Sequence, residues 1–184
     1  MRRMPLKVTT FDSSSPSSLI ASVSGVPNYF GEQRFGRDGS NIALGEAVIA
    51  GRRVSRSKRS IGLSAVRSLH FNNELSQRIN AGTWNRLLPG DTANLDGSGS
   101  IFEVDRVTEE LAQRCAELDI HPCGTLPALE AAGVRSANRP LRMRVDKLQW
   151  ELKEGVLWLG FQLRRGCFAT SVLRELVRYT QRRI

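Results

Sequence analysis

Residues 25–41, from Gly25 to Asn41, read GVPNYFGEQRFGRDGSN, and the interpretation of the whole chain depends on them. Glycines recur after Gly25 at positions 31, 36 and 39, and each would destabilise a helix or strand interior by about 0.5–1 kcal/mol relative to alanine. Their spacing therefore predicts a loop that turns sharply and approaches a partner closely. The polar and aromatic residues between them are Asn28, Tyr29, Phe30, Gln33, Arg34 and Phe35.

Side chains of these types can hydrogen-bond to base edges and phosphates, and their rings can stack on unpaired bases. The stretch therefore indicates a loop that binds RNA. The alternative is a glycine-rich surface loop whose aromatic rings fill the local core, because glycine-rich stretches are weak motifs by themselves.

The stretch resembles the central motif of the TruD family of tRNA pseudouridine synthases, in which VPNYFG is followed by QRFG and GSN. Three further stretches match the family in the same order. The first resembles the family's KRS-LSA-RS-FN helix through Lys58, Arg59, Leu63, Ser64, Ala65, Arg67, Ser68, Phe71 and Asn72. The second resembles its GD-L-G-F hairpin through Gly90, Asp91, Leu95, Asp96, Gly97 and Phe102. The third resembles its GSFATSV-REL segment through Gly166, Phe168, Ala169, Thr170, Ser171, Val172, Arg174, Glu175 and Leu176.

The charge of the chain points to a polyanionic partner. Lys and Arg number 27 against 18 Asp and Glu, a net charge of +9 over 184 residues. Residues 51–60, GRRVSRSKRS, carry five basic side chains and no acid, and residues 164–183 carry a second arginine-rich run. Arginine suits phosphate because its guanidinium is a planar fork of donors. The alternative is a basic protein whose arginines are simply solvated.

Other partners are not indicated. The sequence has no run of eighteen apolar residues and no apolar core followed by a cleavage site near its start, so we expect a cytoplasmic protein that does not enter a membrane. Cys115, Cys123 and Cys167 form no CxxC pair, and the two histidines are His70 and His121. We therefore expect reduced thiols, no metal site and no cofactor.

Hydrophobic periodicity predicts an α+β fold. Strands are expected at 6–10, 87–88, 93–95, 100–104 and 141–145, and as a hairpin over 148–163. Helices are expected at 15–25, 40–51, 59–80, 108–118, 126–132 and 170–179. In the longest of them, Ile61, Ala65, Leu69, Phe71, Leu75 and Ile79 form the apolar face. At 141–145 an apolar strand face alternates with a basic one that carries Arg142 and Arg144.

The resemblance implies three parts of the chain. Residues 1–27 would be a strand and helix of the catalytic domain, 28–146 a TruD-type insertion domain that is shortened after Gly124, and 147–184 the hairpin and helix that return to the catalytic domain. The strand at 6–10 and the hairpin at 148–163 should then belong to one sheet. Since the catalytic domain would be incomplete, its apolar face should be uncovered, at Leu157, Trp158, Leu159, Phe161 and Trp150.

The family isomerises uridine-13 of tRNA to pseudouridine with an aspartate of a GxKDxxAxTxQ-type motif, and an Asn-x-Phe element lines its pocket. The sequence contains neither, so the resemblance implies a truncated chain that is inactive alone, with a separate chain as a possible source of the catalytic half. Asp12, Asp38, Asp91 and Asp96 lack the Lys-Asp context, and we interpret them as structural.

By resemblance, no catalytic residue is predicted, and tRNA is the expected partner. The residues that we predict to bind RNA are Asn28, Tyr29, Phe30, Gln33, Arg34, Phe35, Asn41, Lys58, Arg59, Arg67, Phe168 and Arg174. Two other interpretations stay open. One is an RNA-binding module without catalysis, and the other is an inert gene remnant or a module that binds another protein.

Overall fold

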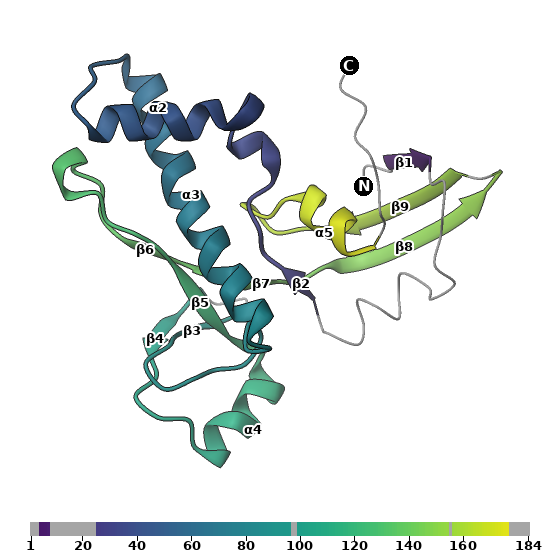
Figure 1. Ribbon diagram of the computed structural model, residues 1–184. Coiled ribbons are helices and arrows are strands. Elements are labelled where there is room, and N and C mark those ends of the chain that lie inside the picture. The colour runs from purple at the N-terminus through teal and green to yellow at the C-terminus, as the bar shows by residue number, and fades with distance from the viewer. Residues whose placement is uncertain (1–3, 8–24, 97–98, 155, 177–184) are drawn as a thin grey trace. The chain divides into compact units, whose positions relative to one another are not determined.

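The computed structural model describes residues 4–7, 25–96, 99–154 and 156–176. Helices and antiparallel strands are both present, which confirms the predicted α+β class (Figure 1). The chain divides into two compact units. The first unit combines Met1–Asn28 with Met143–Ile184, and the second unit is Tyr29–Arg142. Within the described part of the chain, no helix has the length and apolar character needed to cross a membrane.

The first unit contains an antiparallel sheet in the order β1-β9-β8. Its strands are β1 (Met4–Lys7), β9 (Val156–Gln162) and β8 (Asp146–Lys153). The register pairs Leu6 with Leu157 and Trp150 with Leu159. This pairing confirms that the strand near residue 6 and the later hairpin form one sheet. Residues 8–10 and the helix predicted at 15–25 lie outside the described residues.

Helix α5 (Ala169–Leu176) covers the central strand of this sheet. Leu173 packs with Leu157 and Leu159, which are at most 1% exposed. The prediction that these two leucines are uncovered is therefore wrong, because α5 shields β9. On β8 two apolar residues stay accessible: Trp150 is 38% exposed and Leu152 is 51% exposed. Since β8 ends the order of the described strands, Trp150 and Leu152 lie at an edge of the sheet.

A second sheet has two short strands, β2 (Val26–Pro27) and β7 (Arg142–Met143). Val26 and Met143 form a buried cluster with Val172 of α5. The start of the VPNYFG stretch is therefore a strand whose side chains are buried.

The second unit is built around α3 (Arg56–Asn80), a helix of 25 residues. The Ser55 side chain accepts a hydrogen bond from the Lys58 backbone amide at its start. Ala65, Phe71 and Leu75 are buried, as predicted, but Ile61 is 48% exposed. Gly62 and Leu63 are buried beside it, so the buried face is rotated from the predicted one in the first turns of the helix. His70 is exposed.

Helix α2 (Ser40–Ile49) crosses α3 with backbone touching backbone. A Cβ atom added to Gly45 would lie 2.3 Å from the Gly62 carbonyl oxygen, and one added to Gly62 would lie 2.7 Å from the Gly45 nitrogen. Helix axes come this close only where neither residue has a side chain. The two glycines therefore set the position of α2 on α3.

The other half of the second unit is a four-stranded antiparallel sheet in the order β4-β3-β5-β6. Its strands are β3 (Thr92–Leu95), β4 (Ile101–Glu103), β5 (Ile120–Leu126) and β6 (Ala137–Pro140). Helix α4 (Glu109–Leu118), which was predicted, is capped by Thr108 and packs Leu111 and Cys115 on the sheet's core. Two predictions are wrong: Leu87 and Leu88 form no strand, and 126–132 contains the end of β5 and a 3₁₀ turn, η3 (Glu130–Ala132).

Arg142, which the sequence analysis placed on the basic face of its strand, is buried. Its guanidinium contacts the His121 ring and forms an ion pair with Asp119 at 3.3 Å. Both partners belong to the α4–β5 corner, which draws the arginine inward. Burial, and next to it the positive charge of Arg142, lower the pKa of His121 to about 4, against the opposing effect of Asp119 and Asp96.

Gly62→Ala tests the contact between α2 and α3. Helix propensity alone would stabilise this variant by about 1 kcal/mol, whereas overpacking against the Gly45 backbone should destabilise it by about 1–3 kcal/mol. We expect a lower urea midpoint for unfolding. Ser60→Ala, at an exposed position of the same helix, is the control and should change stability by less than about 0.5 kcal/mol. A Gly62→Ala variant as stable as the wild type would contradict the contact.

His121 predicts how stability depends on pH. The pKa of His121 is lower in the folded protein than its ordinary value of 6.5, so the unfolded state binds the proton more readily. The free energy of unfolding should therefore fall as the pH is lowered from about 6.5 towards 4. His121→Gln should make urea-unfolding curves less dependent on pH in this range, whereas His70→Gln should not. Equal pH dependence of His121→Gln and wild type would rule out this account.

Candidate nucleic-acid interface

The glycine-rich loop runs through two 3₁₀ turns, η1 (Glu32–Arg34) and η2 (Arg37–Gly39), into α2. Gly36 and Gly39 have φ angles of 75° and 77°, a region that favours glycine. A Cβ on Gly36 would also lie 2.6 Å from the Ser40 hydroxyl oxygen. The predicted sharp turn is present, and its glycines allow the loop to fold back on the first turn of α2.

The first two aromatic rings of the loop pack inward against α3. The Asn72 side chain bonds both backbone groups of Phe30: its Oδ1 accepts from the Phe30 amide at 2.9 Å, and its Nδ2 donates to the Phe30 carbonyl at 3.0 Å. The Tyr29 hydroxyl is hydrogen-bonded to Ser76 at 2.9 Å. Phe30 meets Phe71 edge to face, with the ring centroids 5.6 Å apart. Tyr29 and Phe30 are buried, so these two rings fill the core of the second unit.

Two arginines lie on the Phe30 ring. The guanidinium carbon of Arg139, on β6, is 4.1 Å from the ring centroid, and that of Arg34 is 5.5 Å away. Arg34 also donates to the Ser64 hydroxyl at 3.2 Å. Cation–π contacts of this kind favour the positive charge next to the ring. The sequence gives no signal for Arg139, because its strand lies more than a hundred residues after Phe30 and belongs to none of the four family motifs.

Two other predicted RNA-binding arginines contact backbone carbonyls. Arg59 donates to the Ala132 carbonyl at 3.0 Å. Arg67 donates to the carbonyls of Pro127, Leu126 and Arg135, at distances from 2.8 to 3.1 Å. Burial lowers the pKa of the Arg67 guanidinium. Both side chains therefore hold the segment after β5 against α3, and their role in RNA binding stays a prediction.

The predicted site is divided between the units. Asn28, Phe168 and Arg174 belong to the first unit, where Asn28 is buried, Phe168 is half-buried and Arg174 is exposed on α5. The other predicted residues belong to the second unit. There Gln33 and Lys58 are exposed, and Phe35 and Asn41 are half-buried. Asn41 donates from its amide to the Arg34 carbonyl, which ties the loop to α2.

Asn41 and Lys58 line the same hollow, which has a volume of about 510 Å³ between the first turns of α2 and α3. We call it the α2–α3 hollow. Its other lining residues include Ala43, Leu44, Arg52 and Ile61. None of the residues that line it is acidic. The hollow therefore combines an apolar floor with basic side chains.

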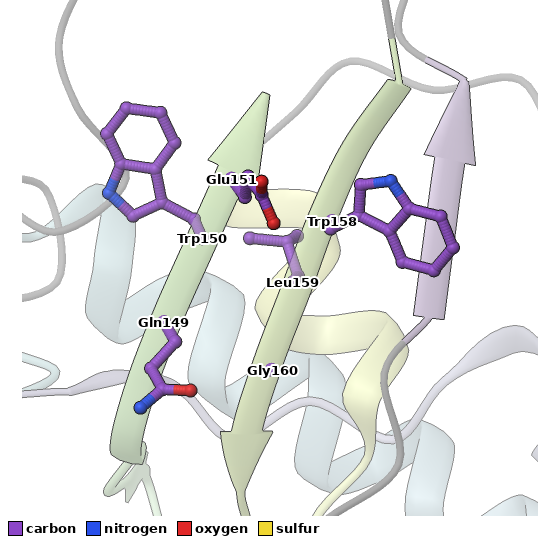
Figure 2. Close-up of a pocket in the computed structure, with 6 residues that line it drawn as sticks. All are labelled: Gln149, Trp150, Glu151, Trp158, Leu159 and Gly160. Atoms are coloured by element: carbon purple, nitrogen blue, oxygen red, sulfur yellow. The ribbon is translucent and has the colours of Figure 1, made fainter. Parts of the chain in front are cut away.

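A second hollow, of about 280 Å³, lies on the sheet of the first unit (Figure 2). It is lined by Gln149, Glu151, Trp158 and Gly160, with Trp150 and Leu159. Figure 2 shows the rings of Trp150 and Trp158 turned away from one another across the β8–β9 hairpin. With Glu151 at its wall, this hollow is less suited to a phosphate than the α2–α3 hollow.

The four aspartates of the sequence analysis lie in different settings. Asp91 forms an ion pair with Arg78 at 2.9 Å and accepts from the Leu88 amide, as expected for a structural residue. Asp38 is exposed in η2, with a φ of 52°. Asp96 is half-buried in the turn after β3. Asp12 lies outside the described residues.

Comparison with known proteins shows relatives along most of the chain. The tRNA pseudouridine synthase D of Aeromonas hydrophila is 42% identical over 83% of this chain and 51% of its own length. The proteins of the same name from Xanthomonas axonopodis and Methylococcus capsulatus are each 37% identical, over 83% and 84% of this chain and 53% and 52% of their own lengths. No family model matches the chain.

A solved structure shows the same fold. The crystal structure of the Methanosarcina mazei protein named tRNA pseudouridine synthase D (TruD) superposes with a TM-score of 0.64, covering 95% of this chain and 68% of that one at 19% identity. The chain spans about half the length of the curated relatives that it matches. Over that half, the chain is similar to proteins named tRNA pseudouridine synthase D at 37–42% identity.

Proposed function

We propose that this chain is the tRNA-binding part of a pseudouridine synthase that, by resemblance, isomerises uridine-13 in tRNA. The observation that carries the proposal is the 37–42% identity to proteins named tRNA pseudouridine synthase D along more than four-fifths of the chain. The net charge of +9 supports a polyanionic partner. We place the protein in the cytoplasm, where tRNA is modified.

In this proposal, the second unit, Tyr29–Arg142, is the insertion domain, and the first unit is part of the catalytic domain. The exposed apolar residues on β8 support the second assignment. Trp150 and Leu152 lie at the edge of the described sheet, where a further strand could pair and a further apolar layer could cover them. The partner that fits this edge is a polypeptide corresponding to the half of the relatives that this chain does not match.

Catalysis requires an aspartate that can attack the flipped uridine, and the family's Lys-Asp context is absent from this sequence. Asp91 is paired with Arg78, and Asp119 with Arg142. Asp38 is exposed on a loop rather than set in a dry pocket. We therefore propose that the 184-residue chain binds tRNA but does not isomerise uridine by itself.

The structure favours the loop before α3, together with the first turn of α3, as the phosphate-binding surface. Arg52, Arg53, Arg56 and Lys58 are exposed, whereas Arg59 and Arg67 bond to backbone carbonyls. The second candidate function, an RNA-binding module without any catalytic role, is favoured by the same exposed residues and by the missing Lys-Asp motif. The two functions differ in whether a catalytic half restores activity.

Pseudouridine formation separates these candidates. Purified chain incubated with unmodified tRNA should give no pseudouridine when the product is mapped by carbodiimide treatment and primer extension. Adding the part of the Aeromonas hydrophila relative that this chain does not match should restore modification, because it supplies the missing aspartate.

The control for that experiment is the same added polypeptide without this chain, which should be inactive. Pseudouridine made by this chain alone would contradict the proposal, and Asp38→Ala would then test the most accessible aspartate. If activity is not restored although the two polypeptides bind each other, the module without catalysis is favoured.

The salt dependence of binding tests the basic loop. Each phosphate that the protein no longer neutralises should make the slope of log K against log salt less steep by roughly 0.7–0.9. A variant with four glutamines should therefore bind tRNA more weakly and with a flatter slope. Its substituted positions are Arg52, Arg53, Arg56 and Lys58.

A variant with the same reduction of charge elsewhere in the second unit is the matched control. Its substituted positions are the exposed Arg86, Arg106, Arg114 and Arg135. Filter binding at several salt concentrations should show the larger change for the loop variant. Equal changes in the two variants would mean that only the net charge matters.

A further inference from the structure

The α2–α3 hollow exposes apolar side chains that are not part of the buried core. Ile61 is 48% exposed, although it lies in the first turns of a helix whose neighbouring residues Gly62 and Leu63 are buried. It contributes to the floor of the hollow together with Leu44, which is half-buried on α2. A volume of about 510 Å³ is within the range of about 300–1,000 Å³ typical of small-ligand sites.

The glycine contact explains why this space is open. Gly45 and Gly62 meet without side chains, so α2 and α3 touch along their backbones. Leu44 and Ile61, each one residue before a glycine of the contact, consequently lie beside the crossing rather than between the helices. The hollow is thus built from the same contact that holds the helices together.

The charges around the hollow favour an anion. Arg52 and Lys58 line it, and both are exposed. The first turn of α3 contains no acidic residue and carries Arg56, Lys58 and Arg59, although the helix dipole favours acids at this end. By contrast, α4 begins with Glu109 and Glu110. Bound phosphate would offset the repulsion at the start of α3.

We propose that the α2–α3 hollow receives one unstacked nucleotide of the bound RNA. The base would lie on Leu44 and Ile61, and its phosphate would lie against Arg52 and Lys58. Bases taken out of their stack are held against aromatic or apolar side chains, and cations bind the backbone phosphates. The inference rests on the proposed function, since it assumes that the chain binds RNA, and it assigns the position of one nucleotide.

The first test compares two RNAs that carry the same number of phosphates: a hairpin with an unpaired loop and a fully paired duplex. Ile61→Ser should weaken binding of the hairpin about tenfold, which corresponds to 1.4 kcal/mol, and leave duplex binding unchanged. Lys58→Gln should weaken binding of both RNAs and flatten the salt dependence. Leu118→Ser is the matched control: Leu118 is 46% exposed on α4 and should not affect either RNA.

The second test uses hairpins with 4-thiouridine at single loop positions, crosslinked to the full chain by ultraviolet light. At one loop position, the crosslinked peptides should contain residues of the first turns of α2 and α3. Crosslinks only elsewhere, or an Ile61→Ser variant that binds the hairpin like the wild type, would overturn the nucleotide site and leave tRNA binding intact.

Two other outcomes would also overturn the inference. A wild-type chain that binds no RNA would remove the proposed function together with the site. A change of oligomeric state in Ile61→Ser, with RNA binding unchanged, would assign the hollow to a protein contact. Circular dichroism of each variant shows whether the fold is retained.

Discussion

The backbone contact between Gly45 and Gly62 is the constraint on which the second unit depends. Any side chain at either position would meet the opposite backbone at less than 3 Å, so the two helices can cross this closely only if both positions are glycine. This contact places the glycine-rich loop at the start of α2 next to α3, where Asn72 and Ser76 bond Phe30 and Tyr29. It also leaves Leu44 and Ile61 beside the crossing. The same backbone contact therefore determines both the packing of the core and the accessible apolar surface beside it.

A similar close approach joins α3 to the sheet. A Cβ on Gly124 of β5 would lie 2.7 Å from a Leu141 methyl carbon and 2.9 Å from the Phe71 ring. Phe71 in turn meets Phe30, and Arg139 of β6 lies 5.4 Å from the Phe71 ring centroid. The loop, the long helix and the sheet of this unit therefore share one aromatic centre, with an arginine from a distant strand beside it.

The arginines of this chain have two kinds of role. Arg59, Arg67 and Arg142 contact carbonyls or an acid within the second unit. Replacing one of them would remove hydrogen bonds or an ion pair that hold segments of this unit together. Arg52 and Arg53 of the loop before α3, and Arg56 at the start of α3, are exposed and thus accessible to a phosphate. A positive net charge does not distinguish the two kinds.

Several features were determined by the sequence itself, because they depend on local order. The long helix that ends at Asn80, the capping of α4 by Thr108, the sharp glycine turn and the α+β class all follow from neighbouring residues, although the long helix begins at Arg56 and not at the expected Arg59. The four ordered motifs were sufficient to indicate the family. The pairing of the strand near residue 6 with the later hairpin was predicted from the resemblance to that family.

The tertiary structure decided what depends on contacts between distant segments. Periodicity placed Ile61 on the apolar face of its helix, but the residue is 48% exposed, and it placed Arg142 on the basic face of its strand, where the structure buries it. The reason is that the burial of a side chain depends on the element that packs against it. Helix α2 packs on the side of α3 that carries Gly62, and the α4–β5 corner supplies partners for Arg142. Leu157 and Leu159 are likewise covered by α5, a helix that follows their strand in the sequence. Whether a side chain is buried depends on the assembled fold, because the pattern of residues along one segment does not specify which other element will pack against it.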